Sequence, residues 1–180
     1  RGYGGAIPYK RIPPAMETRK RVEQGAKYHV ARCASQFIHP EGLIAIDGGT
    51  TNLLLASLMQ LSTRLTVVTN SFPVAEELRK RPKIDVLFLG GYYNKASQTT
   101  VGDTVYSQIK GFHFDQLFLG TYCIDPEIGV TAPAPYEDEA SVKRLLVKNS
   151  SEVNVMAALS KLGTASNYVI CKMDQIDRIV

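Results

Sequence analysis

The 180-residue sequence has few of the residues that hold metals or form disulfides. Its three cysteines, Cys33, Cys123 and Cys171, are far apart and lie among apolar residues. We therefore expect buried free thiols and no disulfide framework or CxxC metal site. The three histidines are equally scattered and show no HxxxH or HExxH spacing, which argues against zinc. No metal and no cofactor are predicted.

Long apolar runs and common nucleotide-binding motifs are also missing. No run reaches the length of a membrane span, and residues 1–6 lack the charged and then apolar pattern of a signal peptide. Neither GxGxxG nor GxxxxGK[ST] occurs, so dinucleotide or nucleotide binding is poorly supported. We expect a soluble, cytoplasmic protein with no membrane partner, made of one domain and a short appendage.

The net charge of +4 comes from the N-terminal part of the chain. Residues 1–40 hold eight Lys and Arg against two Glu, whereas the remainder holds thirteen basic and fifteen acidic residues. The basic side chains between positions 19 and 32 are Arg19, Lys20, Arg21, Lys27 and Arg32. They could contact nucleic acid phosphates, but a solvated helix face explains them as well, so they predict no DNA contact by themselves.

The first 40 residues divide into a linker and a helix. Residues 1–14 are rich in Gly and Pro and have no periodic apolar face, which is typical of a linker from a preceding domain. From 15 to 38 apolar residues recur at helical spacing, until Pro40 and Gly42 end the pattern. This segment is predicted to be one amphipathic helix.

After residue 42, apolar runs alternate with segments of helical spacing. The predicted strands are 43–46, 65–68, 84–89, 114–119, 153–157, 168–171 and 176–180, and the predicted helices are 52–60, one through 78–79, 103–110 and 136–149. Residues 94–100 and 125–135 are expected to be loops. Apolar strands separated by helices are typical of a parallel sheet covered on both faces. We predict an α/β, three-layer, Rossmann-like fold for residues 15–180.

The segment from Ile44 to Asn52 resembles a phosphate-binding loop in its chemistry. An apolar strand ends at Asp47, two glycines follow, and Thr50 and Thr51 precede a leucine-rich helix. The glycines permit a tight turn, either threonine can cap the helix, and the free amides at a helix start attract anions. An ordinary strand-to-helix connection has the same composition, so this segment alone does not decide between the two.

Small or hydrogen-bonding residues also follow the other predicted strands. These segments are Thr69-Asn70-Ser71, Gly90-Gly91, Gly120-Thr121 and Ser160-Lys161. Because ligands bind beyond the carboxyl ends of the strands in an open parallel sheet, we expect these segments to share one site with residues 47–51. Amides, hydroxyls, a carboxylate and a lysine together suit a small, polyhydroxylated and phosphorylated molecule, and we favour a sugar phosphate.

The order of short motifs along the whole chain resembles the C-terminal effector-binding domain of DeoR-type bacterial transcription repressors. The motifs are Arg1-Gly2-Tyr3-Gly4-Gly5-Ala6, Asp47-Gly48-Gly49-Thr50-Thr51, Val67-Val68-Thr69-Asn70-Ser71, Leu89-Gly90-Gly91, Val101-Gly102, residues 115–120, Gly129-Val130-Thr131, residues 139–143 and Ser160-Lys161-Leu162-Gly163. The resemblance implies a fold similar to sugar-phosphate isomerases. It also implies an N-terminal winged helix-turn-helix that binds operator DNA, a phosphorylated sugar as effector, and assembly as a homodimer or homotetramer.

Carried over onto this sequence, the resemblance implies a set of effector-binding residues. They are Asp47, Gly48, Gly49, Thr50, Thr51, Thr69, Asn70, Ser71, Gly90, Gly91, Gly120, Glu139, Lys143 and Lys161. One departure concerns Ala158, because the family commonly has Asp-Ser-Ser-Lys where this chain has Ala-Leu-Ser-Lys. An expected carboxylate is therefore missing, and Lys161 is either held differently or belongs to a weakened site.

Two other hypotheses remain beside an allosteric sensor. An enzyme on the same scaffold, such as a sugar-phosphate isomerase or hydrolase, would use Asp47, Glu139 or Lys161 as acid or base. The missing acid at Ala158 counts against it. A scaffold that binds no ligand is the third hypothesis, and it predicts that no phosphosugar raises the melting temperature.

Overall fold

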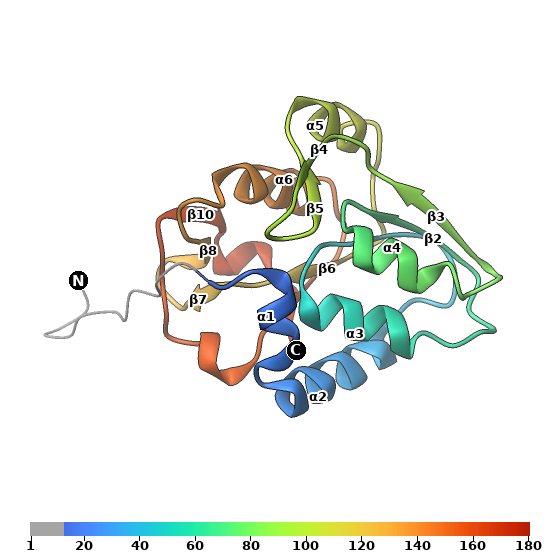
Figure 1. Cartoon of the computed structure of the whole chain (residues 1–180), viewed down its shortest axis with the longest axis horizontal. Coiled ribbons are helices and arrows are strands. Elements are labelled where there is room, and N and C mark those ends of the chain that lie inside the picture. The colour runs from blue at the N-terminus through green and yellow to red at the C-terminus, as the bar shows by residue number, and fades with distance from the viewer. Residues whose placement is uncertain (1–12) are drawn as a thin grey trace, which may run out of the picture.

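A computed structural model describes residues 13–180, so the predicted linker lies outside the described residues except for Pro13 and Pro14. The central element is a six-stranded sheet in the order β11-β9-β6-β1-β2-β3, and its neighbouring strands pair in parallel (Figure 1). The strands are β1 (Leu43–Ile46), β2 (Leu65–Thr69), β3 (Ile84–Phe88), β6 (Gln116–Gly120), β9 (Val153–Met156) and β11 (Arg178–Ile179). The predicted mostly parallel α/β fold is confirmed.

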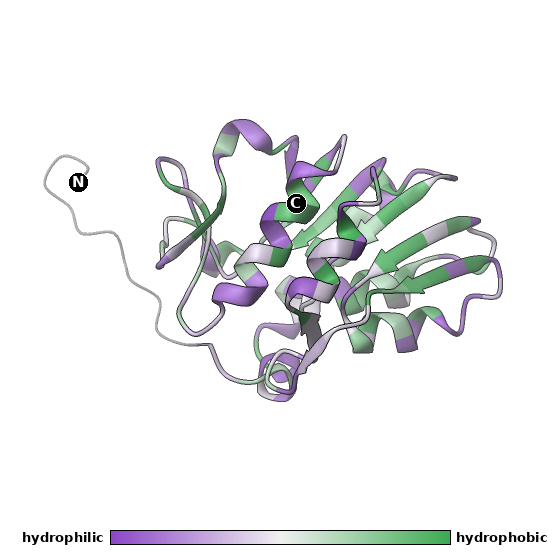
Figure 2. Ribbon diagram, turned by 90° about the horizontal axis from the view of Figure 1, so that it is seen from above, coloured by the Kyte–Doolittle hydropathy of each residue, from purple (hydrophilic) through white to green (hydrophobic). Residues whose placement is uncertain are grey.

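Helices cover both faces of this sheet, as the apolar strands require. The helices are α1 (Met16–Arg21), α2 (Gln24–Ala34), α3 (Thr50–Leu58), α4 (Phe72–Leu78), α5 (Asp103–Ile109) and α6 (Glu137–Lys148). Successive strand residues point to opposite faces. Phe118 of β6 accordingly packs with α2, α3 and α4, whereas Leu117 and Leu119 pack with α5 and α6. One hydrophobic core therefore lies on each face of the sheet. Figure 2 shows the hydrophobic strands between helices that are more polar.

Two predicted loops contain short antiparallel strands. Residues 92–101 form a hairpin of β4 (Tyr92–Asn94) and β5 (Thr99–Val101). Strands β7 (Cys123–Asp125), β8 (Gly129–Ala132) and β10 (Tyr168–Cys171) form a second sheet in the order β10-β8-β7. The loop predictions for 94–100 and 125–135 are therefore wrong in these parts. Strands of three or four residues, several of them polar, do not show the alternation by which strands are recognised in a sequence.

The predicted single helix at 15–38 is also wrong, because the chain breaks between α1 and α2. Glu23 adopts a left-handed conformation with φ of 50°. The Lys27 ammonium donates hydrogen bonds of 2.6 Å to the carbonyl oxygens of Arg19 and Val22 at the end of α1. The Arg19 carbonyl oxygen also accepts a hydrogen bond of 3.3 Å from the Val22 amide, so Lys27 completes the pairing of the carbonyl groups at this helix end. A one-turn helix η1 (Ser35–Phe37) continues directly from α2.

The cysteine prediction is confirmed at two positions and wrong at the third. Cys123 and Cys171 are buried free thiols, and burial raises the pKa of Cys171 to about 11, whereas Cys33 is exposed. Within residues 13–180, no group of three or more His, Cys, Asp or Glu side chains is arranged to hold a metal ion. In the same part of the chain, no helix has both the length and the apolar character needed to cross a membrane.

Candidate functional site

A cavity of about 330 Å³ lies where β1 and β6 end. Its walls come from the loop 48–52, the segment 120–122, helix α6 and the one-turn helix η2 (Leu159–Lys161), together with residues of α1, α2 and the β4–β5 hairpin. The volume falls within the range of about 300–1,000 Å³ that is usual for small-molecule sites. Of the strand ends expected to share one site, those after β1, β6 and β9 line this cavity.

The loop after β1 presents the start of α3 to this cavity. Gly49 has φ of 124°, a conformation that favours glycine, and the space beside Gly48 is already filled by the Thr99 side chain. Thr50 and Thr51 line the cavity. The predicted threonine cap is wrong, because Gly49 is the N-cap and α3 has no side-chain cap. The first amides of α3 are thus left for a ligand, at the end of the helix that favours anions.

Asn52 holds this loop in place. Its amide nitrogen donates hydrogen bonds of 2.9 Å to the carbonyl oxygens of Asp47 and Phe118, and the side chain is fully buried. The loop after β1 is therefore attached to β6 by a buried side chain. Such support from rigid elements keeps the ligand-facing backbone in a fixed geometry.

A buried ion pair joins the ends of β1 and β6 to α6. The Lys143 ammonium donates to Asp47 Oδ2 and to the Gly120 carbonyl oxygen, the latter at 2.9 Å, and the Gly120 amide donates to Asp47 Oδ2 at 2.9 Å. Any side chain at Gly120 would collide with the Gly48 carbonyl oxygen. Lys143 lines the cavity, whereas Asp47 lies behind it. The geometry thus gives Asp47 a supporting position.

Lys161 reaches the cavity from η2. Its ammonium donates to the Thr121 carbonyl oxygen, and the side chain is half-buried. The neighbouring Ala158, which stands where the resemblance implies a carboxylate, is buried with 2% of its surface exposed. The Thr121 carbonyl oxygen is thus one partner of the Lys161 ammonium in this chain.

Glu139 and Tyr122 form a buried polar pair in the cavity wall. The Tyr122 hydroxyl donates to Glu139 Oε2 at 2.9 Å, and the Ser97 side chain also lies against the Glu139 carboxyl, where it opposes the effect of burial on the pKa of this group. Burial raises the pKa of the Glu139 carboxyl and raises the pKa of Tyr122 well above its usual value. Compared with an exposed glutamate, Glu139 therefore favours the protonated form, which can donate a hydrogen bond to a ligand oxygen.

The other predicted site residues lie behind the cavity or beside it. Thr69, Asn70 and Ser71 are buried, and the Asn70 amide donates to the Thr100 carbonyl oxygen at 2.9 Å. They support the β4–β5 hairpin, which carries the cavity residues Ser97 and Thr99. Gly90 and Gly91 pack against α5, where Gln108 donates to the Gly90 carbonyl oxygen at 2.8 Å. None of these five predicted residues lines the cavity.

Sequence reasoning missed the cavity residues contributed by the N-terminal helices. Arg19, Glu23 and Lys27 line the cavity, although the basic residues of this region were assigned to a possible nucleic acid contact or a solvated face. Their placement depends on the helix break at Glu23, which no residue pattern in the sequence predicts. Tyr122 was also missed, because an aromatic residue after a strand has no specific signal.

A three-layer α/β domain with a cavity beyond its strand ends has the architecture in which small molecules commonly bind. Residues 22–180 match the family model described as the DeoR C terminal sensor domain. The chain belongs to this family of transcription-regulator sensor domains, which confirms the resemblance.

Curated relatives support the same assignment. Over the whole chain and 68% of the relative, the sequence is 32% identical to the "Putative aga operon transcriptional repressor" of Escherichia coli O157:H7. It is 31% identical to the "HTH-type transcriptional regulator GlpR" of Haloferax volcanii, over the whole chain and 70% of the relative. It is also 28% identical to the "HTH-type transcriptional repressor GlcR" of Bacillus subtilis, covering 98% of this chain and 68% of the relative. These relatives are named as regulators of transcription.

Solved structures share the fold at low sequence identity. Ribose 5-phosphate isomerase A from Methanocaldococcus jannaschii has a TM-score of 0.56 and 14% identity, covering 77% of this chain and 54% of the isomerase. The probable sor operon regulator from Shigella flexneri has a TM-score of 0.56 and 10% identity, covering 91% and 84%. The chain thus spans about half the length of the isomerase. The predicted similarity to sugar-phosphate isomerases is confirmed at the level of the fold.

Proposed function

We propose that this sensor domain binds a phosphorylated sugar, and that binding modulates operator recognition by a DNA-binding domain joined to it through residues 1–14. The observation that carries the proposal is the cavity at the start of α3, a helix without a side-chain cap, where two threonines and buried lysines line the same wall. Membership of a sensor-domain family and relatives named as helix-turn-helix regulators support it. In this proposal DNA is contacted only through the N-terminal domain.

The proposed binding mode assigns different parts of the ligand to different walls. The phosphate binds the amides of residues 49–51 and the hydroxyls of Thr50 and Thr51, while Lys161 adds a positive charge. The sugar hydroxyls lie against Glu139 and the hairpin residue Ser97. The carboxyl group of Glu139 and the hydroxyl of Ser97 can each form a hydrogen bond with a sugar hydroxyl. The buried ion pair of Asp47 and Lys143 holds the loop and α6 together. Because the two charges are opposite and adjacent, they largely offset each other.

Regulation then requires that the ligand prefer one conformation of the regulator. A coupling free energy of about 1–3 kcal/mol between ligand and operator binding is usual for such systems. Ligand contacts must differ between the two conformations, since equal contacts would shift no equilibrium. Helices α1 and α2 form part of the cavity wall and lie close to the proposed linker. Their contacts with the ligand can therefore differ between the two conformations.

A thermal-shift titration tests the ligand class. The panel contains D-ribose 5-phosphate, D-glucose 6-phosphate, D-fructose 1-phosphate, N-acetyl-D-galactosamine 6-phosphate and sn-glycerol 3-phosphate, with each unphosphorylated parent compound as a control. A ligand at 100 times its Kd adds about 2.7 kcal/mol to the free energy of unfolding, which raises Tm by about 5–10 °C in a domain of this size. If no phosphorylated compound raises Tm more than its parent, the proposal is wrong.

The variant Thr50→Ala tests whether the loop at α3 is the binding site. Loss of a hydroxyl that donates to a phosphate is expected to weaken binding by about 1.5–3 kcal/mol, which reduces the ligand-induced Tm shift to about half or less. Thr104→Ala is the matched control, because Thr104 is an exposed threonine in the first turn of α5. An equal response of both variants would place the ligand elsewhere.

An enzyme is the second candidate, because the fold is shared with ribose 5-phosphate isomerases and Glu139 lies in the cavity wall with a raised pKa. Isomerisation requires a proton transfer by a group within about 3 Å of the substrate. Incubating the domain with aldose phosphates and following ketose formation separates the two candidates. Binding without turnover supports the sensor, and turnover lost in Glu139→Gln supports the enzyme.

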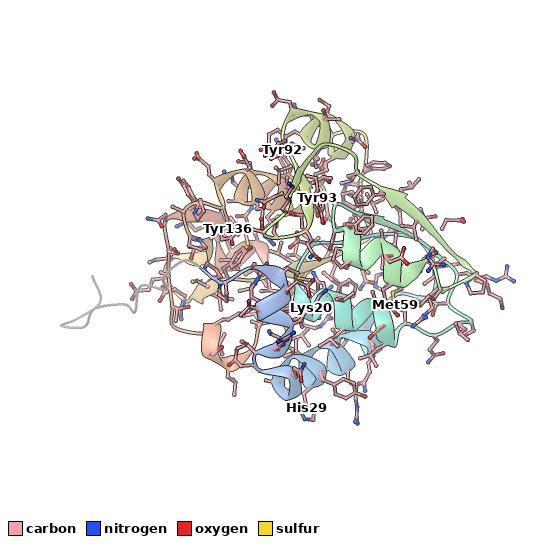
Figure 3. All side chains as sticks on the ribbon, viewed as in Figure 1. Lys20, His29, Met59, Tyr92, Tyr93 and Tyr136 are labelled. Carbon is pink, nitrogen blue, oxygen red and sulfur yellow. The ribbon has the colours of Figure 1, made fainter. Side chains whose placement is uncertain are left out.

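We also propose that the regulator is a homodimer or homotetramer that uses the outer edge of the sheet. Phe72, Phe88 and Tyr93 form an exposed edge aromatic patch, in which the centre of the Phe72 ring lies 6.5 Å from that of Phe88 and 6.3 Å from that of Tyr93. Figure 3 labels Tyr93 on this side of the molecule. The patch borders β3, the last strand of the sheet, whose outer backbone groups can pair with a second copy. Pairing of identical strands about a two-fold axis is self-complementary.

Phe88→Asp is expected to convert the oligomer into a monomer, because a carboxylate in an apolar interface is left without its water. Light scattering after size-exclusion chromatography measures the mass. Leu61→Asp is the control, because Leu61 is 62% exposed and lies outside the edge aromatic patch. A wild-type chain that is monomeric at micromolar concentration, or an oligomer that survives Phe88→Asp, contradicts this interface.

A further inference from the structure

Helix α1 places an arginine in the cavity wall without giving it a carboxylate partner. Within residues 13–180, Arg19 forms no ion pair, and its Nε atom is buried without a hydrogen bond. The guanidinium carbon lies 5.3 Å from the centre of the Tyr122 ring, the same ring whose hydroxyl binds Glu139. A buried polar atom without a partner is costly and rare, so it calls for a partner beyond the described residues, such as a bound ligand.

The position of Arg19 is fixed by contacts of the α1 backbone. Met16 is fully buried, and its amide donates to the Ala96 carbonyl oxygen at 2.8 Å. At the other end of the helix, Lys27 binds the Arg19 and Val22 carbonyl oxygens. Helix α1 lies beside α3 (Figure 1) and is tied to the β4–β5 hairpin at one end and to α2 at the other. Its arginine lines the cavity from this supported backbone.

The break after α1 connects this helix to the opposite part of the cavity wall. Glu23 Oε2 accepts a hydrogen bond of 2.9 Å from the Ser160 hydroxyl, next to Lys161 on η2. Arg19, Glu23 and Lys27 all line the cavity, although they precede the central sheet in sequence. Arg19 itself lies outside the matched residues 22–180 of the sensor-domain family. The chain leading into the sensor domain therefore forms one wall of its ligand cavity.

We propose that Arg19 contacts the phosphorylated ligand directly, so that occupancy of the cavity is transmitted to α1, the helix closest to the linker. This inference rests on the proposed function. A guanidinium stacked on Tyr122 presents its planar donors to an oxyanion or to sugar oxygens, which neither Lys143 nor Lys161 can do with a single ammonium. Ligand binding supplies the missing partner of Arg19 and holds α1 more firmly against the domain.

The test compares Arg19→Gln with Arg21→Gln in titrations of the five phosphorylated compounds of the panel. Both variants remove one positive charge from α1, but Arg21 is exposed and lies outside the cavity wall. Loss of one charge-assisted contact is expected to raise Kd by about 10- to 100-fold for Arg19→Gln, and to leave Kd within about two-fold for Arg21→Gln. Arg19→Lys, which keeps the charge without the planar fork, is expected between the two.

Hydrogen exchange of the backbone amides in residues 16–21 gives an independent measurement. Ligand is expected to slow this exchange in the wild-type chain and in Arg21→Gln, but not in Arg19→Gln. A purely structural arginine would lower the ligand-free melting temperature and leave Kd unchanged, which overturns the inference while the proposed function stands. If none of the five compounds binds the wild-type chain, the proposed function fails first and the inference fails with it.

Discussion

Replacing Lys143 with methionine is expected to lower the free energy of unfolding by about 3–5 kcal/mol, because it leaves the buried Asp47 carboxylate without its charge partner. Methionine fills a similar volume, so the change removes the charge with little change in packing. After the substitution, Asp47 Oδ2 retains the hydrogen bond from the Gly120 amide but loses the ammonium. Urea denaturation followed by circular dichroism measures the difference.

Two further variants make this result interpretable. Lys148→Met removes an exposed lysine from the last turn of the same helix, and we expect it to change the free energy of unfolding by less than about 1 kcal/mol. The double variant Asp47→Asn with Lys143→Met removes both charges and is expected to recover part of the loss. A loss of less than 1 kcal/mol in Lys143→Met would show that the buried pair does not hold α6 against the sheet.

The middle of the central sheet could be predicted from the sequence because strands β1, β6 and β9 are buried on both faces. Run 43–46 is apolar throughout and run 65–68 is apolar except for Thr66, and each is followed by small or polar residues and a helix. In these segments the local strand preference, the burial and the topology all agree. The apolar pattern therefore predicts a buried parallel strand without ambiguity. The convergence of residues 48–51, Gly120 and Lys161 on one cavity then follows from parallel pairing, since all strand ends of one kind lie on one edge.

The parts of the site that escaped prediction depend on contacts between distant segments. The helix break at Glu23 is stabilised by Lys27, whose ammonium binds backbone carbonyls, and a buried lysine cannot be distinguished from an exposed one by its position in the sequence. The same break turns Arg19 toward Tyr122, a residue more than one hundred positions away. Gly90 was expected in the site for its sequence context alone, yet Gln108 binds it to α5.

Replacing Phe118 with alanine is expected to lower the free energy of unfolding by about 3–5 kcal/mol, as is usual when a fully buried phenylalanine is truncated. Phe118 lies on β6 between β1 and β9, has no exposed surface, and packs into the core formed with α2, α3 and α4. Neighbouring strands hold the backbone on both sides, so the core cannot collapse fully into the space that remains. Urea denaturation monitored by circular dichroism measures the change, and Tyr28→Ala at a 43% exposed position on α2 is the control.

The effect of Phe118→Ala on ligand binding separates stability from recognition. The Phe118 carbonyl oxygen accepts hydrogen bonds from the Asp47 amide at 3.1 Å and from the Asn52 side chain at 2.9 Å, and alanine retains that carbonyl. At temperatures where the variant is folded, we therefore expect the ligand to bind with a Kd within about three-fold of the wild-type value, since the side chain faces away from the cavity wall. A variant that stays folded but no longer binds would show that the loop after β1 depends on packing beneath the sheet as well as on its hydrogen bonds to β6.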